Sequence, residues 1–154
     1  MEFTSQEDIE APIDRVFAAL SDFDTMERQA MRHGAKVRRH PTGADGTGPR
    51  WTAGFRFRGR EIEAEVSLLR SEPPETLEFS GKAGGMETGM QVDLTPLTPN
   101  RTRMTVRAQL APKTLSARLL VQSLKLARAR MTRKFSVRVA QFAKTLETRA
   151  QKAA

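Results

Sequence analysis

The segment LSARLLVQSLKLARARMTRKFSVRVAQFAKTLETRAQK, residues 115–152, decides the fold. It contains no Gly or Pro, and its apolar residues recur at steps of three or four, which is the spacing of one helical face. A helix of about 35 residues is about 50 Å long, whereas a ten-residue strand covers about 33 Å. The segment therefore predicts one long helix that crosses a whole sheet. Its apolar positions are Leu120, Leu124, Ala127, Met131, Phe135, Val139, Phe142 and Leu146.

Length and composition restrict the class of protein. The 154 residues fit one domain, 1–154, that is large enough for a hydrophobic core. The first eight residues are polar and acidic, unlike a secretory signal, and no apolar run approaches the roughly 18 residues of a membrane span, so we expect a cytoplasmic protein. The absence of Cys excludes disulfides, thiol nucleophiles and thiolate metal sites.

The net charge of +8 is unevenly distributed. Residues 115–154 hold ten Lys or Arg and a single acid, Glu147, and so carry +9. Residues 1–114 hold sixteen bases and seventeen acids, and so carry −1. A basic helix of this kind is either a solvated face or a surface for anionic lipid or nucleic acid.

The first third of the chain predicts two short helices between strands. Pro12 suits the first turn of a helix. The next helix has Asp24 or Thr25 as its expected cap and Gly34 at its end. The glycines of the following loop lack the pattern of a phosphate-binding loop. The expected elements are strand 2–11, either at an edge of the sheet or closing a barrel, helix 13–20, a second helix up to 33, strand 35–40 and loop 41–49.

Residues 50–71 predict a β-hairpin. If Gly59 and Arg60 form a two-residue turn, one register gives an apolar face and a face of opposed charges. The Arg and Glu side chains then have a structural role as cross-strand pairs, and we do not expect the glutamates to be catalytic. The predicted pairs are Arg58 with Glu61, Arg56 with Glu63, Gly54 with Glu65, Phe57 with Ile62, Phe55 with Ala64, Ala53 with Val66 and Trp51 with Leu68.

Three more strands precede the long helix. They are expected at 75–80, 86–97 and 102–110, with a loop at 81–85 and with Pro112 ending the sheet. Consecutive strands with helices outside the run indicate an α+β chain with an antiparallel sheet.

Three motifs follow one another along the chain: Ile9-Glu10-Ala11-Pro12-Ile13-Asp14-Arg15-Val16-Phe17 with Leu20-Ser21-Asp22, Gly48-x-x-Trp51, and Leu94-Thr95-Pro96-Leu97 with Thr102-Arg103. This ordered set resembles the START-like superfamily, also called SRPBCC, which includes the polyketide cyclase/dehydrase and lipid-transport proteins and the birch-pollen allergens. The resemblance implies a helix-grip fold, in which a curved antiparallel sheet of about seven strands wraps around the long C-terminal helix, with two short helices after the first strand. It also implies an apolar cavity between sheet and helix.

The candidate ligand-binding residues are the inward strand positions and the near half of the long helix. Val139, Phe142 and Leu146 are expected to rest on the two short helices instead. Arg138 falls within the apolar stripe, where it either extends to solvent, pairs with an acid such as Asp22 or Asp24, or anchors a ligand carboxylate or phosphate. The candidates are Trp51, Phe55, Phe57, Val66, Phe79, Met90, Val92, Met104, Val106, Leu120, Leu124, Met131, Phe135 and Arg138.

Three classes of function follow. Family members bind lipids, sterols or polyketides, so the leading prediction is binding or transport of a hydrophobic small molecule. A cyclase/dehydratase-type enzyme on such a molecule is the first alternative, but the inward positions carry almost no acid or base, and neither His33 nor His40 lies in the hairpin core. We predict no catalytic residue, metal site or cofactor. The second alternative is binding of anionic membrane, or less readily of nucleic acid, through the basic helix, whose aromatics point inward.

Overall fold

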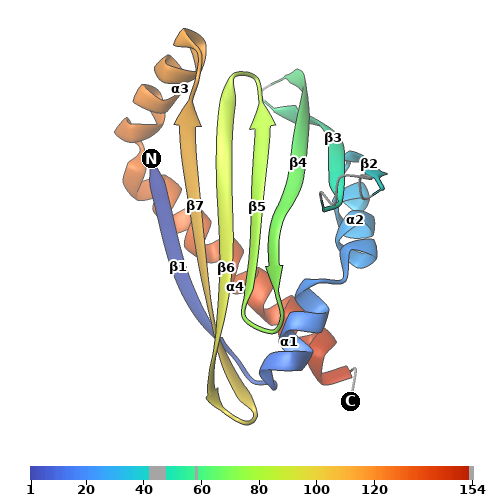
Figure 1. Ribbon diagram of the computed structural model, residues 1–154. Helices are drawn as coiled ribbons and strands as arrows, with labels where there is room; N and C mark the ends of the chain where they lie inside the picture. The colour runs from blue at the N-terminus through green and yellow to red at the C-terminus, as the bar shows by residue number, and fades with distance from the viewer. Residues whose placement is uncertain (42–47, 58, 153–154) are drawn as a thin grey trace.

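The computed structural model describes residues 1–41, 48–57 and 59–152. The described residues form one antiparallel sheet of seven strands and four helices (Figure 1). The fold is therefore α+β, as predicted. In chain order the elements are β1 Glu2–Ile9, α1 Ile13–Leu20, α2 Phe23–Arg32, β2 Lys36–His40, β3 Arg50–Phe57, β4 Arg60–Glu72, β5 Thr76–Ala83, β6 Met86–Thr98, β7 Arg101–Pro112, α3 Leu115–Leu126 and α4 Arg128–Lys152.

The sheet has the order β1-β7-β6-β5-β4-β3-β2, so β1 and β2 are its edges. Strands β2 to β7 pair consecutively, and β1 closes the other side by pairing with β7. In Figure 1 the outer face of the curved sheet is toward the viewer, and α4 crosses behind it. We call the covered side the inner face. This arrangement confirms the predicted helix grip.

The predicted single helix over 115–152 is two helices, which is the main correction to the fold. At Ala127 the backbone has φ −107° and ψ 24°. The Ala127 N–H donates to the carbonyl oxygen of Leu124 at 3.0 Å instead of the oxygen four residues back. Helix α3 packs on β7, whereas α4 packs on β1 and α1. Because the two halves follow different parts of the molecule, tertiary packing overrides the strong local helix propensity.

The hairpin of β3 and β4 forms, but in a register two residues away from the predicted one. Phe57 lies opposite Arg60, and Arg56 lies opposite Glu61 rather than Glu63. Gly59 has φ +76°, a conformation that glycine adopts at little cost, so the turn lies one position earlier than expected. A shift of two leaves each side chain on its predicted face, because strand side chains alternate with a period of two. Arg58 and most of the loop 41–49 lie outside the described residues.

The cap of α2 is Asp22, not Asp24 or Thr25. Its carboxylate accepts hydrogen bonds from the Thr25 N–H at 3.3 Å and the Thr25 hydroxyl at 2.6 Å. These two bonds, the hydroxyl one foremost, lower the pKa of Asp22. Gly34, with φ +94°, follows the end of the helix as predicted.

Two strand ends also differ from prediction. The expected loop 81–85 is only a turn at Gly84 and Gly85, with φ values of +54° and +77°, and β5 continues to Ala83. Strand β7 continues two residues beyond its predicted end at Leu110, and Pro112, opposite Met86, is its last paired residue, so Pro112 ends the sheet as predicted.

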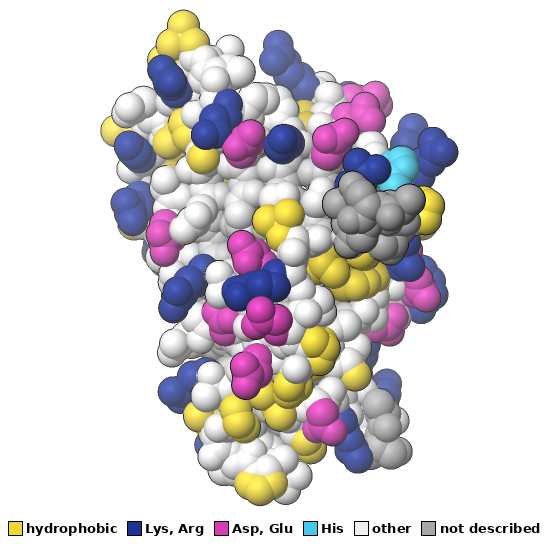
Figure 2. All heavy atoms as spheres, in the orientation of Figure 1, with side chains coloured by type: hydrophobic (Ala, Val, Ile, Leu, Met, Phe, Trp, Pro, Cys, Tyr) yellow, Lys and Arg dark blue, Asp and Glu magenta, His cyan; other side chains and the backbone are white. Residues whose placement is uncertain are grey.

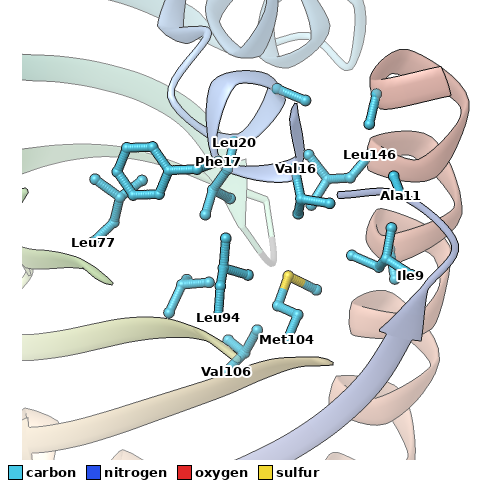
Figure 3. Close-up of a cluster of buried hydrophobic side chains, with 14 of the residues drawn as sticks. Ile9, Ala11, Val16, Phe17, Leu20, Leu77, Leu94, Met104, Val106 and Leu146 are labelled. Atoms are coloured by element: carbon cyan, nitrogen blue, oxygen red, sulfur yellow. The ribbon is translucent and has the colours of Figure 1, made fainter. Parts of the chain in front are cut away.

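The hydrophobic core lies at the α1 end of the molecule (Figure 3). Side chains from β1, α1, the sheet and α4 meet there, and Thr102, fully buried, donates its hydroxyl hydrogen bond to the Ala11 carbonyl at 2.8 Å. The core residues are Ile9, Ala11, Val16, Phe17, Ala19, Leu20, Leu77, Val92, Leu94, Met104, Val106, Val139, Ala143, Leu146 and Ala150.

Candidate functional site

The inner face of the sheet divides into a core half and an open half. In the core half, Val92, Met104 and Val106 are at most 4% exposed and belong to the hydrophobic core formed with α1 and α4. These three residues were predicted to bind ligand, but they pack against protein. Val139 and Leu146 of α4 belong to the same core, in the supporting role predicted for them.

The open half carries large apolar side chains in contact with solvent. Phe55 is 38% exposed, Phe57 45% and Met90 43%. All three share the inner face, because Phe55 and Phe57 lie an even number of residues after the buried Trp51, and Met90 lies two residues before the buried Val92. Apolar residues on one face that remain exposed mark a surface suited to a hydrophobic ligand.

An aromatic cluster separates the two halves. The ring centroids of Phe23 and Trp51 are 5.1 Å apart, those of Phe23 and Phe79 6.2 Å, and those of Trp51 and Phe79 6.4 Å. Across the face, Phe3 and Phe135 approach to 5.7 Å. Phe23 and Phe3 were absent from the predicted site. The cap of α2 at Asp22, two residues before Asp24, makes Phe23 the first residue of the helix, and the predicted caps left Phe23 outside it.

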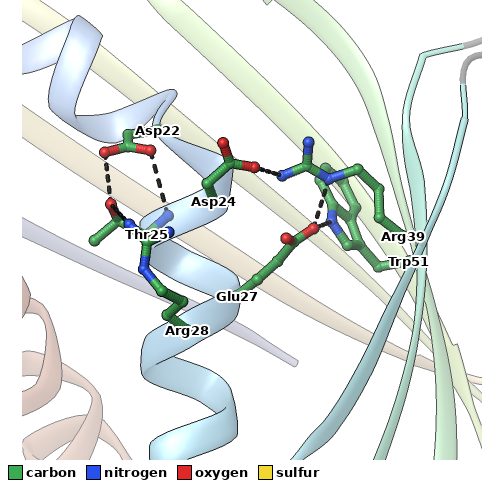
Figure 4. Close-up of polar contacts among 7 residues, drawn as sticks. All are labelled: Asp22, Asp24, Thr25, Glu27, Arg28, Arg39 and Trp51. Atoms are coloured by element: carbon green, nitrogen blue, oxygen red, sulfur yellow. Dashed lines mark hydrogen bonds and ion pairs between the residues drawn. The ribbon is translucent and has the colours of Figure 1, made fainter.

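Polar contacts hold α2 against the cluster (Figure 4). Glu27 accepts a hydrogen bond from the Trp51 Nε1–H at 2.7 Å and also pairs with Arg39, which reaches Asp24 at 2.7 Å. The bond to Glu27 is the main cause of the raised pKa of Arg39. The side chain of Glu27 is only 18% exposed and is engaged by two partners, so its arrangement is that of a structural acid.

The helical candidates occupy different environments. Leu120 and Leu124 of α3 and Met131 and Phe135 of α4 are half-buried. Arg138, however, is exposed, so its predicted place within the buried stripe is wrong. The buried side of α4 centres on Val139, Ala143, Leu146 and Ala150, and Arg138 lies about 110° around the helix axis from that centre.

Among the described residues no ion pair joins Arg138 to Asp22 or Asp24, the acids that were considered as its partners. Val66 is half-buried on the inner face of β4.

A groove with a volume of about 890 Å³ lies over β2, β3 and β4, and Phe55 of the open half is among its lining residues. Most of its lining residues are polar, and they include His40, whose Nε2 lies 2.8 Å from the Thr52 hydroxyl. Arg56 and Glu61 face one another there, but within the described ranges they do not approach to an ion-pair distance. The other histidine, His33, is exposed at the end of α2.

In the part of the chain that the structure describes, no group of three or more His, Asp or Glu side chains is placed to hold a metal ion. No helix among the same residues is both long and apolar enough to cross a membrane.

The fold and the apolar inner face define a helix-grip protein, and the comparisons name its family. The family model described as "Polyketide cyclase / dehydrase and lipid transport" matches residues 1–147, so the chain belongs to this family. No curated relative matches the chain.

Solved structures show the same fold at low sequence identity. A protein from Thermus thermophilus is 17% identical with a TM-score of 0.65, over 100% of this chain and 99% of that one. A START superfamily protein from Mycobacterium smegmatis is 13% identical with a TM-score of 0.62, over 99% of both chains. Truncated norcoclaurine synthase from Thalictrum flavum is 13% identical with a TM-score of 0.62, over 80% of this chain and 82% of that one.

Proposed function

We propose that the protein binds a hydrophobic small molecule, of the lipid, sterol or polyketide kind, on the open half of its inner face. The observation that carries the proposal is the exposure of Phe55, Phe57 and Met90 beside a closed core. A folded chain gains free energy by burying such side chains, at about 25 cal/mol per Å². Much of their surface remains in contact with solvent, on the side of the sheet where the helix-grip resemblance implies a ligand.

The extent of the site follows from the packing. The aromatic cluster of Phe23, Trp51 and Phe79 closes it toward the core. Half-buried Leu120 and Met131 lie on the two helices that meet at residue 127. A ligand seated here contacts aromatic, thioether and aliphatic groups, which favours an apolar body with some freedom of shape.

The carrier function is favoured over the enzymatic alternative by the same geometry. Acid/base catalysis needs a positioned group with a free proton-transfer atom. Glu27, which reaches the aromatic cluster, already accepts from Trp51 and pairs with Arg39. Norcoclaurine synthase shares the fold and is named as a synthase, yet at 13% identity it transfers no residue roles to this chain.

A ligand screen tests the proposal. Fatty acids, sterols and aromatic polyketides are scored by the shift of the thermal unfolding midpoint, and hits are titrated by calorimetry. Phe55→Ser should weaken a hit several-fold, whereas Leu97→Ser should leave it unchanged. The two positions are matched in exposure, 38% and 40%, but Leu97 lies near the β6–β7 turn at the other end of the sheet. If no compound shifts the midpoint and a crystal structure shows a filled interior, the proposal fails.

A further inference from the structure

Helix α3 has two apolar faces. One face packs toward β7 and includes Ala117, 3% exposed, and Val121, 5% exposed. On the opposite face, Leu115 is 72% exposed, Leu119 62% and Leu126 93%. At about 100° per residue, these three leucines lie within about 40° of one another around the helix axis. We call them the leucine stripe.

Folding of the chain does not account for the exposed apolar side chains of the leucine stripe. Three long aliphatic side chains on one helical face bury little of their surface within the chain, although single exposed leucines are ordinary. The buried face of α3 already supplies the contact that fixes the helix on β7. The stripe therefore presents a surface for something outside the chain.

Basic residues border the stripe on one side, and α3 itself carries no acid. Arg118 and Lys125 border it on one side of α3, and α4 begins with further bases. Residues 115–146 contain no acid at all. None of the ion pairs among the described residues uses a base of α3 or α4. The base cluster is Arg118, Lys125, Arg128, Arg130, Arg133 and Lys134.

The rest of the surface differs from this region. On the outer face of the sheet, basic and acidic side chains are interspersed (Figure 2). Arg70, for example, pairs with Glu72 and Glu78. Over α3, Figure 2 shows basic and hydrophobic side chains next to one another. The partner of this region must therefore offer negative charge and an apolar phase together.

We propose that the leucine stripe and the base cluster form a docking surface for an anionic lipid bilayer. A helix with an apolar face bordered by Lys and Arg lies in the bilayer interface, with the apolar side chains among the acyl chains and the bases at the headgroups. Each base near an anionic surface strengthens binding about fivefold. The stripe lacks the aromatic side chains on which bases of nucleic acid stack. A second copy would bring two base clusters of like charge together.

The location of α3 connects docking with the inner face. Helix α3 lies at the same end of the sheet as the turn between β3 and β4, next to which Phe55 and Phe57 are exposed (Figure 1). The Lys113 N–H donates to the Gly85 carbonyl at 2.8 Å, which ties the start of α3 to the β5–β6 turn at this end. When the protein is docked on a bilayer, the open half of its inner face therefore lies near the bilayer. Docking itself does not depend on ligand binding.

Vesicle co-sedimentation of the full chain tests the surface. We compare vesicles of phosphatidylcholine alone with vesicles that contain about one third phosphatidylglycerol, each at about 50 mM and about 500 mM NaCl. The expected result is binding to the anionic vesicles at low salt, at least about tenfold weaker at high salt or without the anionic lipid. Absence of binding to the anionic vesicles at low salt overturns the proposal.

Matched variants distinguish a contribution of the leucine side chains to vesicle binding from electrostatic attraction alone. The triple variant Leu115→Gln, Leu119→Gln, Leu126→Gln should bind at least about tenfold more weakly. A control triple variant at other exposed apolar residues should bind like wild type. Circular dichroism should show unchanged folding in both, because every altered side chain is exposed. The control positions are Met31, Leu69 and Leu97, which are 49%, 59% and 40% exposed.

Two further outcomes contradict a bilayer as the partner. One is binding to a short duplex of DNA or RNA that equals vesicle binding and survives the leucine changes. The other is a wild-type dimer, seen by light scattering, that the leucine changes convert to a monomer. A variant with Arg130→Gln, Arg133→Gln and Lys134→Gln leaves the leucine stripe intact and should still lose anionic binding by about tenfold or more.

Discussion

Two methionines on the same face of neighbouring strands should differ when replaced by alanine: one change should mainly lower stability and the other should mainly weaken ligand binding. Met104 of β7 is 0% exposed within the core, and Met90 of β6 is 43% exposed in the open half. Removing a fully buried Met side chain costs about 2–5 kcal/mol, because a cavity remains. For a chain of this length about 3 kcal/mol lowers the unfolding midpoint by about 6–12 °C. Met90→Ala leaves no enclosed cavity and should cost about 1 kcal/mol, or about 2–4 °C.

For ligand binding the order of the two variants should be reversed, with the larger effect from Met90→Ala. If the ligand covers the open half, Met90→Ala removes apolar contact of about 1 kcal/mol, which is about fivefold in Kd. Met104→Ala should leave Kd unchanged, because its side chain contacts protein on all sides. Thermal unfolding by circular dichroism and titration with a dansyl-labelled fatty acid give the two quantities. Equal changes of Kd in both variants would refute the division of the inner face, since the ligand would then reach the core.

Two other predictions concern α2 and its contacts. The folded-state pKa of Asp22 lies below its unfolded value because of the bonds from Thr25, so this carboxylate stabilises the fold above pH about 4 and loses that contribution as pH falls through the lowered value. In urea unfolding at pH 7, the free energy of unfolding of the wild type should therefore exceed that of Asp22→Asn by less than about 1 kcal/mol, since solvent screens the exposed group. At strongly acid pH the two free energies of unfolding should be equal. A difference that stays constant with pH would contradict this prediction. Glu27→Ala should cost about 1–3 kcal/mol, because it leaves the buried Trp51 N–H without its acceptor and removes one of the two acids paired with Arg39, and Glu27→Gln should recover part of the loss. Fluorescence of Trp51, the single tryptophan, follows both unfolding curves, and equal losses in the two variants would disprove the role of the hydrogen bond.

The alternation of side chains could be predicted from the sequence more reliably than the pairing of strands. Phe55 and Phe57 were placed correctly on the inner face although their predicted partners were two residues off. Apolar alternation depends only on the period of a strand, which a shift of two preserves. The register depends on where the chain turns, and the positive φ of Gly59 fixes that point. A turn at Gly59-Arg60 and a turn one position earlier satisfied the sequence pattern equally well.

The sequence could predict that residues 115–152 are helical, but not that the helix axis breaks and changes direction. Residues 115–152 contain neither Gly nor Pro, and the break falls at Ala127, the residue type with the highest helix propensity. Nothing local marks that position. The break results from the different contacts of α3 and α4 with the sheet, which are long-range and leave no periodic signal. Arg138 was misplaced for a different reason: the buried side of α4 centres on Val139, Ala143, Leu146 and Ala150 rather than on Phe135 and Phe142.

The candidate site depends on the location of α4 more than on the composition of the strands. Val92 and Met90 are both apolar, share one strand and point the same way, yet Val92 is 3% and Met90 43% exposed. Helix α4 packs on β1 and α1, so it buries the part of the face nearest α1 and leaves the part nearest the β3–β4 turn uncovered. Because α3 diverges from α4 at Ala127, its leucine stripe stands at that uncovered end. The same break therefore leaves the inner face open and directs the exposed leucines outward.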